Sequence, residues 1–371
     1  MVSANLLEVD GLNLPNVFTD NPIVTSIASQ TRGIADAGKV SVTVTDILRL
    51  IGGGQINSST YAAGNGGEIT IHAKDVEIDG LGSNIVTGIA SQTEAGSTGS
   101  AGKVTVTAED TLRLLAGGII STNAISQSQG NAGEVTVNAK QLEIDGEGFT
   151  NILTFIGSQS DFSSGSAGHV IITVTDTLKL LAGGIISSSS FGQGEAGGVT
   201  IVARQMDIDR SQITSSAAGK NAQTGNIEIT VQDDIHLRNN SFISTTNLAT
   251  TTDLNIQAGG ININLGKNGS LHLDSSQINT ESVIGHGGKI DINAKEVISL
   301  FNSSVTTSVY GPIGNGGDIN LASNFLILDT GFIKANTLAA NASGGDININ
   351  PSLTSYGQFL LYFCLVSFLT N

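Results

Sequence analysis

The sequence predicts an all-β protein folded as a right-handed parallel β-helix, a solenoid with three short strands per coil and about 11 to 12 coils of 27 to 36 residues. Three observations predict it. The composition is rich in Gly, with 47 residues, and poor in aromatic residues, with no Trp. Short apolar runs alternate strictly with polar residues, as strands do. The same short segments also recur along the whole chain, as they do in solenoids.

The recurring segment is clearest at residues 102–121, "GKVTVTAEDTLRLLAGGIIS". Related copies begin at Gly38 and Gly168, and a sister unit of the type "GEVTVNAKQLEIDG" begins at Gly67 and Gly133. In the sister unit "LEID" replaces "LRLL", and Asp followed by Gly after an alternating run is typical of a strand that ends in a turn. "TLRLL" is therefore predicted to be a strand, not the start of a helix.

A glycine two residues before the first inward apolar position marks the start of each coil. These landmarks are Gly38, Gly67, Gly102, Gly133, Gly168, Gly197, Gly225, Gly288, Gly317 and Gly345, with Thr252 in place of one missing glycine. The extra residues of the longer coils are assigned to loops, such as "GLGSNIVTG" and "GGININLGKNG". The glycines are expected at corners, where a positive φ is cheap for glycine.

Each coil divides into three strands with inward apolar residues. The first strand has Val104 and Val106, Val135 and Val137, Ile227 and Ile229, Ile290 and Ile292, and Ile347 and Ile349. The second has Leu48 and Leu50, Val76 and Ile78, Leu112 and Leu114, Leu178 and Leu180, Ile235 and Leu237, and Leu271 and Leu273. The third has one such residue per coil, at Ile56, Ile120, Ile186, Ile213, Ile243, Ile278, Val305 and Ile333.

Two other all-β folds fit less well. A β-propeller has four strands per blade and about four to eight blades. An outer-membrane barrel needs strands of about 9 to 11 residues and aromatic girdles. In a solenoid the chain reaches the next parallel strand by going once round the coil, so no helical crossover is needed.

Charge and cysteine content exclude some functions. The formal net charge is -16, from 32 acidic and 16 basic residues, which argues against nucleic-acid binding and is consistent with solubility. The single cysteine, Cys364, cannot form an intrachain disulfide.

Candidate chemical sites all have a structural interpretation. Asp46, Asp110 and Asp176 share one repeat position, and Asp79, Asp145 and Asp209 share another, in the turn after the second strand. Repeated carboxylates favour a structural role over the paired acids of a glycosidase. The histidines, His72, His169, His236, His272 and His286, are assigned to different repeat positions without a metal-ligand spacing.

Two less favoured ligand classes stay open. "GNGGDINL" from Gly314 is a weak match to calcium-binding nonapeptide repeats. Outward threonine pairs in three "TVT" segments could form part of an ice-binding array, at Thr43 and Thr45, Thr105 and Thr107, and Thr173 and Thr175. No catalytic, cofactor-binding or metal-binding residue, and no cofactor, is predicted.

Units such as "GNGGEITIHAK", "GNAGEVTVNAK" and "GNGGDINLAS", followed by "LEIDG" and "QINSS" types, resemble the β-helical shaft of filamentous haemagglutinin-type exoproteins, the secreted partners of two-partner secretion. The resemblance covers about residues 2–350. It implies a secreted or surface-held rod that works in adhesion or aggregation. It also implies export through a dedicated outer-membrane secretion pore and binding to surface glycan or protein receptors.

The chain is expected to consist of a β-helix repeat domain, residues 1–350, and an off-pattern apolar tail, residues 351–371. Aligning "VSANLLEVDG" with "VNAKQLEIDG" places Val2 against Val137, so the repeat domain begins in the middle of a coil. No signal peptide is recognised, and the tail is interpreted as a truncated or frame-shifted end. Uncapped ends would allow end-to-end self-association.

The sequence therefore predicts a non-enzymatic shaft segment of an adhesin-like exoprotein. The alternative is a carbohydrate-active β-helix, a polysaccharide lyase or glycosidase, whose groove would lie near "GLGSN" and "GEGFTN".

Overall fold

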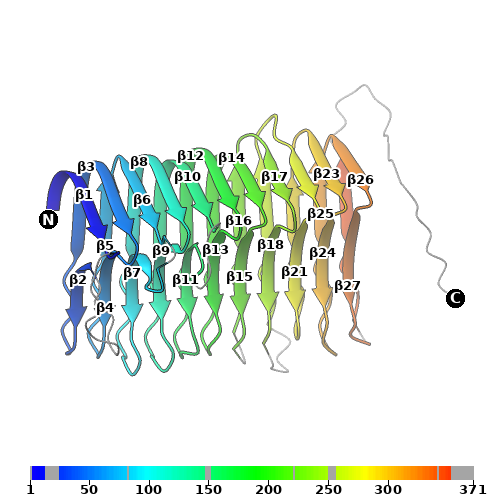
Figure 1. The fold of residues 1–371 in the computed structure, drawn as a ribbon. Coiled ribbons are helices and arrows are strands. Elements are labelled where there is room, and N and C mark those ends of the chain that lie inside the picture. The colour runs from blue at the N-terminus through cyan, green and yellow to red at the C-terminus, as the bar shows by residue number, and fades with distance from the viewer. Residues whose placement is uncertain are drawn as a thin grey trace.

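The computed structural model is a β-solenoid built from parallel strands (Figure 1). It describes residues 2–12, 25–81, 83–146, 152–219, 222–249, 256–340 and 342–351, and these contain strands and no helix. Accordingly, no helix in those ranges is long and apolar enough to span a membrane. Apart from Pro351, which ends the last strand, the predicted tail with Cys364 lies outside the described residues, as does most of "GEGFTN".

Two parallel sheets run along the rod. The larger contains β1 (Val2–Asp10), β3 (Val40–Ile51), β5 (Ile69–Ala73), β6 (Asp75–Asp79), β8 (Val104–Leu115), β10 (Val135–Asp145), β12 (Val170–Leu181), β14 (Val199–Asp209), β16 (Ile227–Val231), β17 (Ile235–Arg238), β19 (Ile261–Leu265), β20 (Leu271–Asp274), β22 (Ile290–Asn293), β23 (Val297–Phe301), β25 (Ile319–Ser323), β26 (Phe325–Asp329) and β28 (Ile347–Pro351). The smaller contains β2 (Ser26–Thr31), β4 (Gln55–Thr60), β7 (Thr87–Thr93), β9 (Gly118–Ala124), β11 (Phe155–Ser160), β13 (Ile185–Ser190), β15 (Gln212–Ala217), β18 (Phe242–Asn247), β21 (Gln277–Ser282), β24 (Ser304–Val309) and β27 (Phe332–Thr337).

The first and second predicted strands of each turn lie in the same sheet. In β3, β8, β10, β12 and β14 they are joined into one strand of 11 or 12 residues, and the pairing shifts register in the middle. Residues 102–121, whose second half could have been helical, form β8 and the start of β9. The fold class is therefore confirmed, and the three strands of each turn are distributed over two sheets.

The predicted inward columns form one continuous apolar core. Leu112, Leu114 and Ile120 are fully buried, as are their counterparts in the neighbouring turns. Val2 pairs with Val42, which leads through β5 and β8 to Val137, so the predicted alignment of these two residues is confirmed. The last turn is the exception: Ile333 is only partly buried, and Ile347 and Ile349, in the last described strand, are exposed.

The landmark glycines do not have the predicted positive φ. A Cβ on Gly133 would lie 2.2 Å from the carbonyl oxygen of Gly102, and the other landmark glycines except Gly38 have similarly close contacts to the preceding turn. Glycine is required there because the turns stack too closely for a side chain. The left-handed conformation occurs instead after the second strand, mostly at residues other than glycine, such as Ala116, Ala182 and Arg210.

One landmark is wrong. Ile261 pairs with Ile227, and a Cβ on Gly259 would lie 2.1 Å from Gly225 O, so Gly259 starts this turn and not Thr252, which lies outside the described residues. The segment "ININL" is then strand β19 and not an insertion. The extra residues lie before Gly259, at the end of the preceding turn, after β18.

A buried column of Ser and Thr connects the smaller sheet to the landmark glycines. Ser91 Oγ accepts a hydrogen bond of 2.8 Å from Gly102 N, and Thr280 Oγ1 donates one of 2.7 Å to Gly288 O. Ser158 does both, with Gly168 N and Gly133 O. These hydroxyls satisfy buried backbone groups at the corner and fix its position.

Candidate functional site

The outer face of the larger sheet carries a column of alternating charge, which we call the central ladder. The positions that pair in successive turns are Glu8, Arg49, Glu77, Arg113, Glu143, Lys179 and Asp207. Arg49 lies 3.5 Å from Glu8 and 3.0 Å from Glu77, and Arg113 lies 3.6 Å from Glu143. Each charge between Glu8 and Asp207 thus has opposite charges on both sides.

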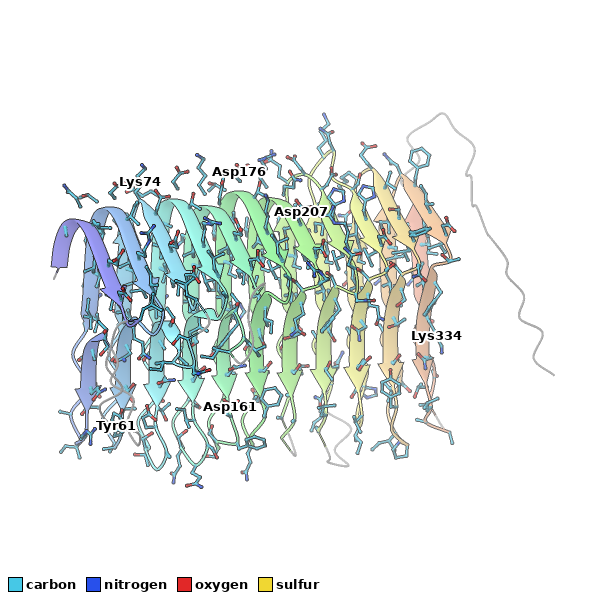
Figure 2. All side chains as sticks on the ribbon, viewed as in Figure 1. Tyr61, Lys74, Asp161, Asp176, Asp207 and Lys334 are labelled. Carbon is cyan, nitrogen blue, oxygen red and sulfur yellow. The ribbon has the colours of Figure 1, made fainter. Side chains whose placement is uncertain are left out.

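A second column, the corner ladder, runs along the bend between the first and second strands. It contains Asp46, Lys74, Asp110, Lys140, Asp176, Arg204 and Asp233, and Lys74 and Asp176 are labelled along this edge in Figure 2. Lys140 Nζ donates to Asp110 Oδ1 at 3.0 Å, and Arg204 pairs with both Asp176 and Asp233. Hydrogen bonds from Arg204 lower the pKa of Asp176.

A third column, the glycine-side ladder, follows the landmark glycines through Lys39, Glu68, Lys103 and Glu134. The Nζ to carboxylate distances are 3.0 Å for Lys39 with Glu68 and 2.6 Å for Lys103 with Glu134. The hydrogen bond from Lys103 lowers the pKa of Glu134. The charges of the three ladders reverse together from one turn to the next. Within the ladders, a turn of one charge pattern therefore lies between turns of the opposite pattern.

The repeated aspartates have structural contacts. Asp46, Asp110 and Asp176 belong to the corner ladder, where each is paired with a cation. Asp79 accepts a hydrogen bond of 2.9 Å from Leu81 N, and Asp209 accepts one of 3.0 Å from Asn239, as expected of residues that form the turn. Burial raises the pKa of Asp79, with the Leu81 hydrogen bond opposing it.

Two of the five histidines share a repeat position, contrary to the prediction. His236 and His272 pair in register on β17 and β20, and their rings stack with centroids 5.0 Å apart. His272 Nδ1 lies 2.8 Å from Ser299 Oγ in the next turn. Burial, and then the charge of His236, lower the pKa of His272, while Asp234 acts in the opposite direction. The pair continues the column of the central ladder beyond Asp207.

The other three histidines lie apart. His72 lies 3.0 Å from Glu109, His169 is 2.8 Å from Thr200 Oγ1, and His286 accepts a hydrogen bond from Asn315 N. Among the described residues no three His, Cys, Asp or Glu side chains are placed to hold one metal ion.

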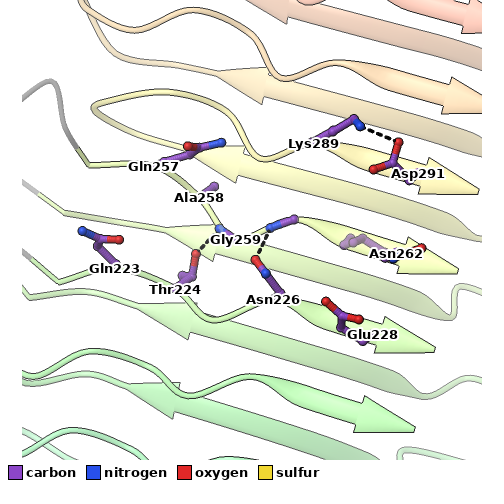
Figure 3. A pocket seen from close by; sticks show the side chains of 12 residues that line it. Gln223, Thr224, Asn226, Glu228, Gln257, Ala258, Gly259, Asn262, Lys289 and Asp291 are labelled. Atoms are coloured by element: carbon purple, nitrogen blue, oxygen red, sulfur yellow. Dashed lines mark hydrogen bonds and ion pairs between the residues drawn. The ribbon is translucent and has the colours of Figure 1, made fainter. Parts of the chain in front are cut away.

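A pocket of about 340 Å³ opens on the larger sheet where β16, β19 and β22 begin (Figure 3). Glu228, Asn262 and Asp291 occupy successive turns along it. Asp291 pairs with Lys289 at 2.9 Å and accepts a hydrogen bond of 2.7 Å from Asn320, so its carboxylate is already engaged. This pocket does not coincide with the groove predicted for a carbohydrate-active enzyme near "GLGSN" and "GEGFTN". Of those two segments, Gly82 and residues 147–151 lie outside the described ranges.

The outer face of the smaller sheet is different, because it is almost free of charge. Each of its eleven strands has three outward positions, and only Glu281 and Lys334 among them are charged. The rest are mainly Ser, Thr, Asn, Gln, Ala and Gly, with three Phe and two Ile, of which Ile119, Phe155 and Ile185 are buried in a small cluster against Ile152. We call this surface the uncharged face. It extends over ten strand intervals, or about 48 Å.

The threonine pairs do not form the array that ice binding would need. Thr43 aligns with His72 and Thr107, whereas Thr105 aligns with Thr70 and lies in the neighbouring column. One member of each pair, Thr43, Thr107 or Thr173, lies in the same column, but His72 and Asn138 interrupt it and Thr105 lies in another column.

The ladders and the uncharged face were not predicted from the sequence. The signal for the ladders was present, because "TLRLL" and "LEID" alternate along the first half of the chain, but opposite charges meet only when the turns are stacked. Comparison of the chain with protein-family models, with curated proteins and with solved structures found no match.

Proposed function

We propose that this chain is a non-enzymatic shaft segment of a secreted or surface-exposed, adhesin-like exoprotein, and that it mediates adhesion or aggregation. The uncharged face is the observation that carries the proposal. It repeats similar hydroxyl and amide side chains in every turn, so one partner can make many weak contacts along the rod. The similarity of the repeat units to haemagglutinin-type shafts supports the same proposal.

The arrangement of charge also supports an extended contact surface. In a chain of net charge -16, acidic side chains repel acidic partners and other copies. The charges described above are paired with one another on the larger sheet and its edges, whereas the smaller sheet presents almost none. A partner can therefore approach the smaller sheet without displacing ion pairs. A secretion pore and surface glycan or protein receptors would be the partners of such an exoprotein.

The test combines adhesion and turnover in one experiment. Beads coated with the full chain, and matched beads coated with albumin, are incubated with epithelial cells and with bacterial cells, and attached beads are counted. The same protein is incubated with acidic and neutral polysaccharides, and new reducing ends or unsaturated products are measured. We expect attachment or clustering of the coated beads without turnover. Turnover without attachment would instead indicate a carbohydrate-active enzyme.

A further inference from the structure

A shallow trough crosses the uncharged face between β11 and β18. Its volume is about 300 Å³, and none of the residues that line it is charged. It is lined by Leu153, Phe155, Gln159, Ile185, Ser187, Ser189, Phe191, Gln212, Thr214, Ser216, Phe242, Ser244 and Thr246. The pocket of Figure 3 differs in this respect, since Glu228, Lys289 and Asp291 line it.

Two partly exposed aromatic rings, Phe191 and Phe242, border the trough, whereas Phe155 at its other end is buried in a cluster with Ile119 and Ile185. Phe155 and Phe242 occupy one outward column, with Ile185 and Gln212 between them, so three strand intervals, or about 14 Å, separate their backbones along the rod. Phe191 follows β13 and is 41% exposed, which leaves part of its ring available to a ligand. The trough therefore runs parallel to the rod and offers apolar surfaces to a ligand that lies along it.

The floor offers hydrogen-bonding groups without charge. Ser187 and Ser189 Oγ atoms lie 2.7 Å apart, and Thr214 Oγ1 donates to Ser187 Oγ at 3.0 Å, which holds these hydroxyls in a row. The side-chain amides of Gln159 and Gln212 have no hydrogen-bond partner within the described part of the chain. Hydroxyl and amide groups both donate and accept, so they match a ligand with many hydroxyls.

We propose that this trough binds an uncharged oligosaccharide, whose sugar rings lie against Phe191 and Phe242 while its hydroxyls bond to the Ser, Thr and Gln floor. The proposal rests on the proposed function, because it names the partner class of the uncharged face. The absence of charge selects against acidic glycans, which the net charge of -16 also repels. The concave shape between aromatic ends suits a narrow chain better than the flat sheet of a second copy.

The experiment measures migration of the full chain in native gels that contain soluble xyloglucan, glucomannan or dextran, and, separately, polygalacturonate. We expect at least one neutral polysaccharide to retard the protein and polygalacturonate not to do so. Thr214→Lys places a long side chain in the trough and should weaken retardation by about tenfold or more. Thr306→Lys is the matched control, because Thr306 occupies the same outward column on β24 outside the trough and should retain binding.

A second pair of variants tests the rings and avoids added charge. Phe191→Leu should weaken binding several-fold, whereas Phe162→Leu, at a phenylalanine that is 75% exposed outside the trough, should not. Thermal unfolding of all four variants checks that they fold.

The proposal is overturned if no neutral polysaccharide binds, if polygalacturonate binds equally, or if both members of a pair lose binding alike. It is also overturned if sedimentation shows that Thr214→Lys only separates a dimer. Bead adhesion that persists without polysaccharide binding would leave the proposed function standing and reject this inference alone.

Discussion

At the scale of single residues, spacing between turns decides where glycine is needed. At Gly133, as at most landmark glycines, a Cβ would collide with a carbonyl of the preceding turn, here Gly102 O, whereas the left-handed turn position is held by residues such as Ala182 at φ 49°. Gly133→Ala should therefore destabilise the protein by about 2 kcal/mol or more. Ala182→Gly should stabilise it by roughly 0.5 to 1 kcal/mol, because glycine adopts positive φ without strain. Urea unfolding measures both, and the opposite order would refute the assignment of these two roles.

The stacked histidines predict a pH dependence of stability. The pKa of His272 is lowered in the folded state by burial and by His236, so protons bind more tightly to the unfolded chain. This contribution to stability is complete above the pKa of histidine in the unfolded chain, about 6.5, and is lost as the pH falls through the lowered pKa of the folded state. Between about pH 7.5 and about pH 5, the free energy of unfolding should fall less in His272→Gln than in the parent. The difference should be below about 1 kcal/mol because the ring is only partly buried. Equal losses in denaturant midpoints would contradict this account.

At the scale of strands and turns, the ladders explain why the repeat has two units. Deleting residues 67–101 would stack Lys39 on Lys103, Asp46 on Asp110 and Arg49 on Arg113. Such exposed like-charge pairs should together cost about 1 to 3 kcal/mol and be screened by salt. Deleting residues 67–132 removes two turns and restores opposite pairs, such as Arg49 with Glu143. We expect thermal stability to rise with salt for the one-turn deletion more than for the two-turn deletion. The same salt response in both would argue against the ladders.

Much of each turn could be predicted because inward apolar and outward polar residues alternate along its strands with a strict period of two. Leu112, Leu114 and Ile120 lie where the alternation places them. What could not be predicted depends on contacts between turns. The role of Gly133 depends on the carbonyl of Gly102. The second-strand pattern already places His236 and His272 between equivalent inward residues, but the stacking of their rings depends on how the two turns pack. The trough brings together side chains from four turns and has no counterpart in any one repeat.

At the scale of the whole molecule, the central claim is that partners bind the uncharged face and not the ladder face. The most direct measurement blocks one face at a time. Cys364→Ser removes the single native thiol, and a cysteine then carries a polyethylene glycol chain either at Thr214 on the smaller sheet or at Thr107 on the larger sheet. Beads coated with each conjugate are tested for attachment to cells. The account predicts that the label at Thr214 abolishes attachment and that the label at Thr107 preserves it. Equal attachment by both conjugates, or loss with the Thr107 label alone, would contradict it.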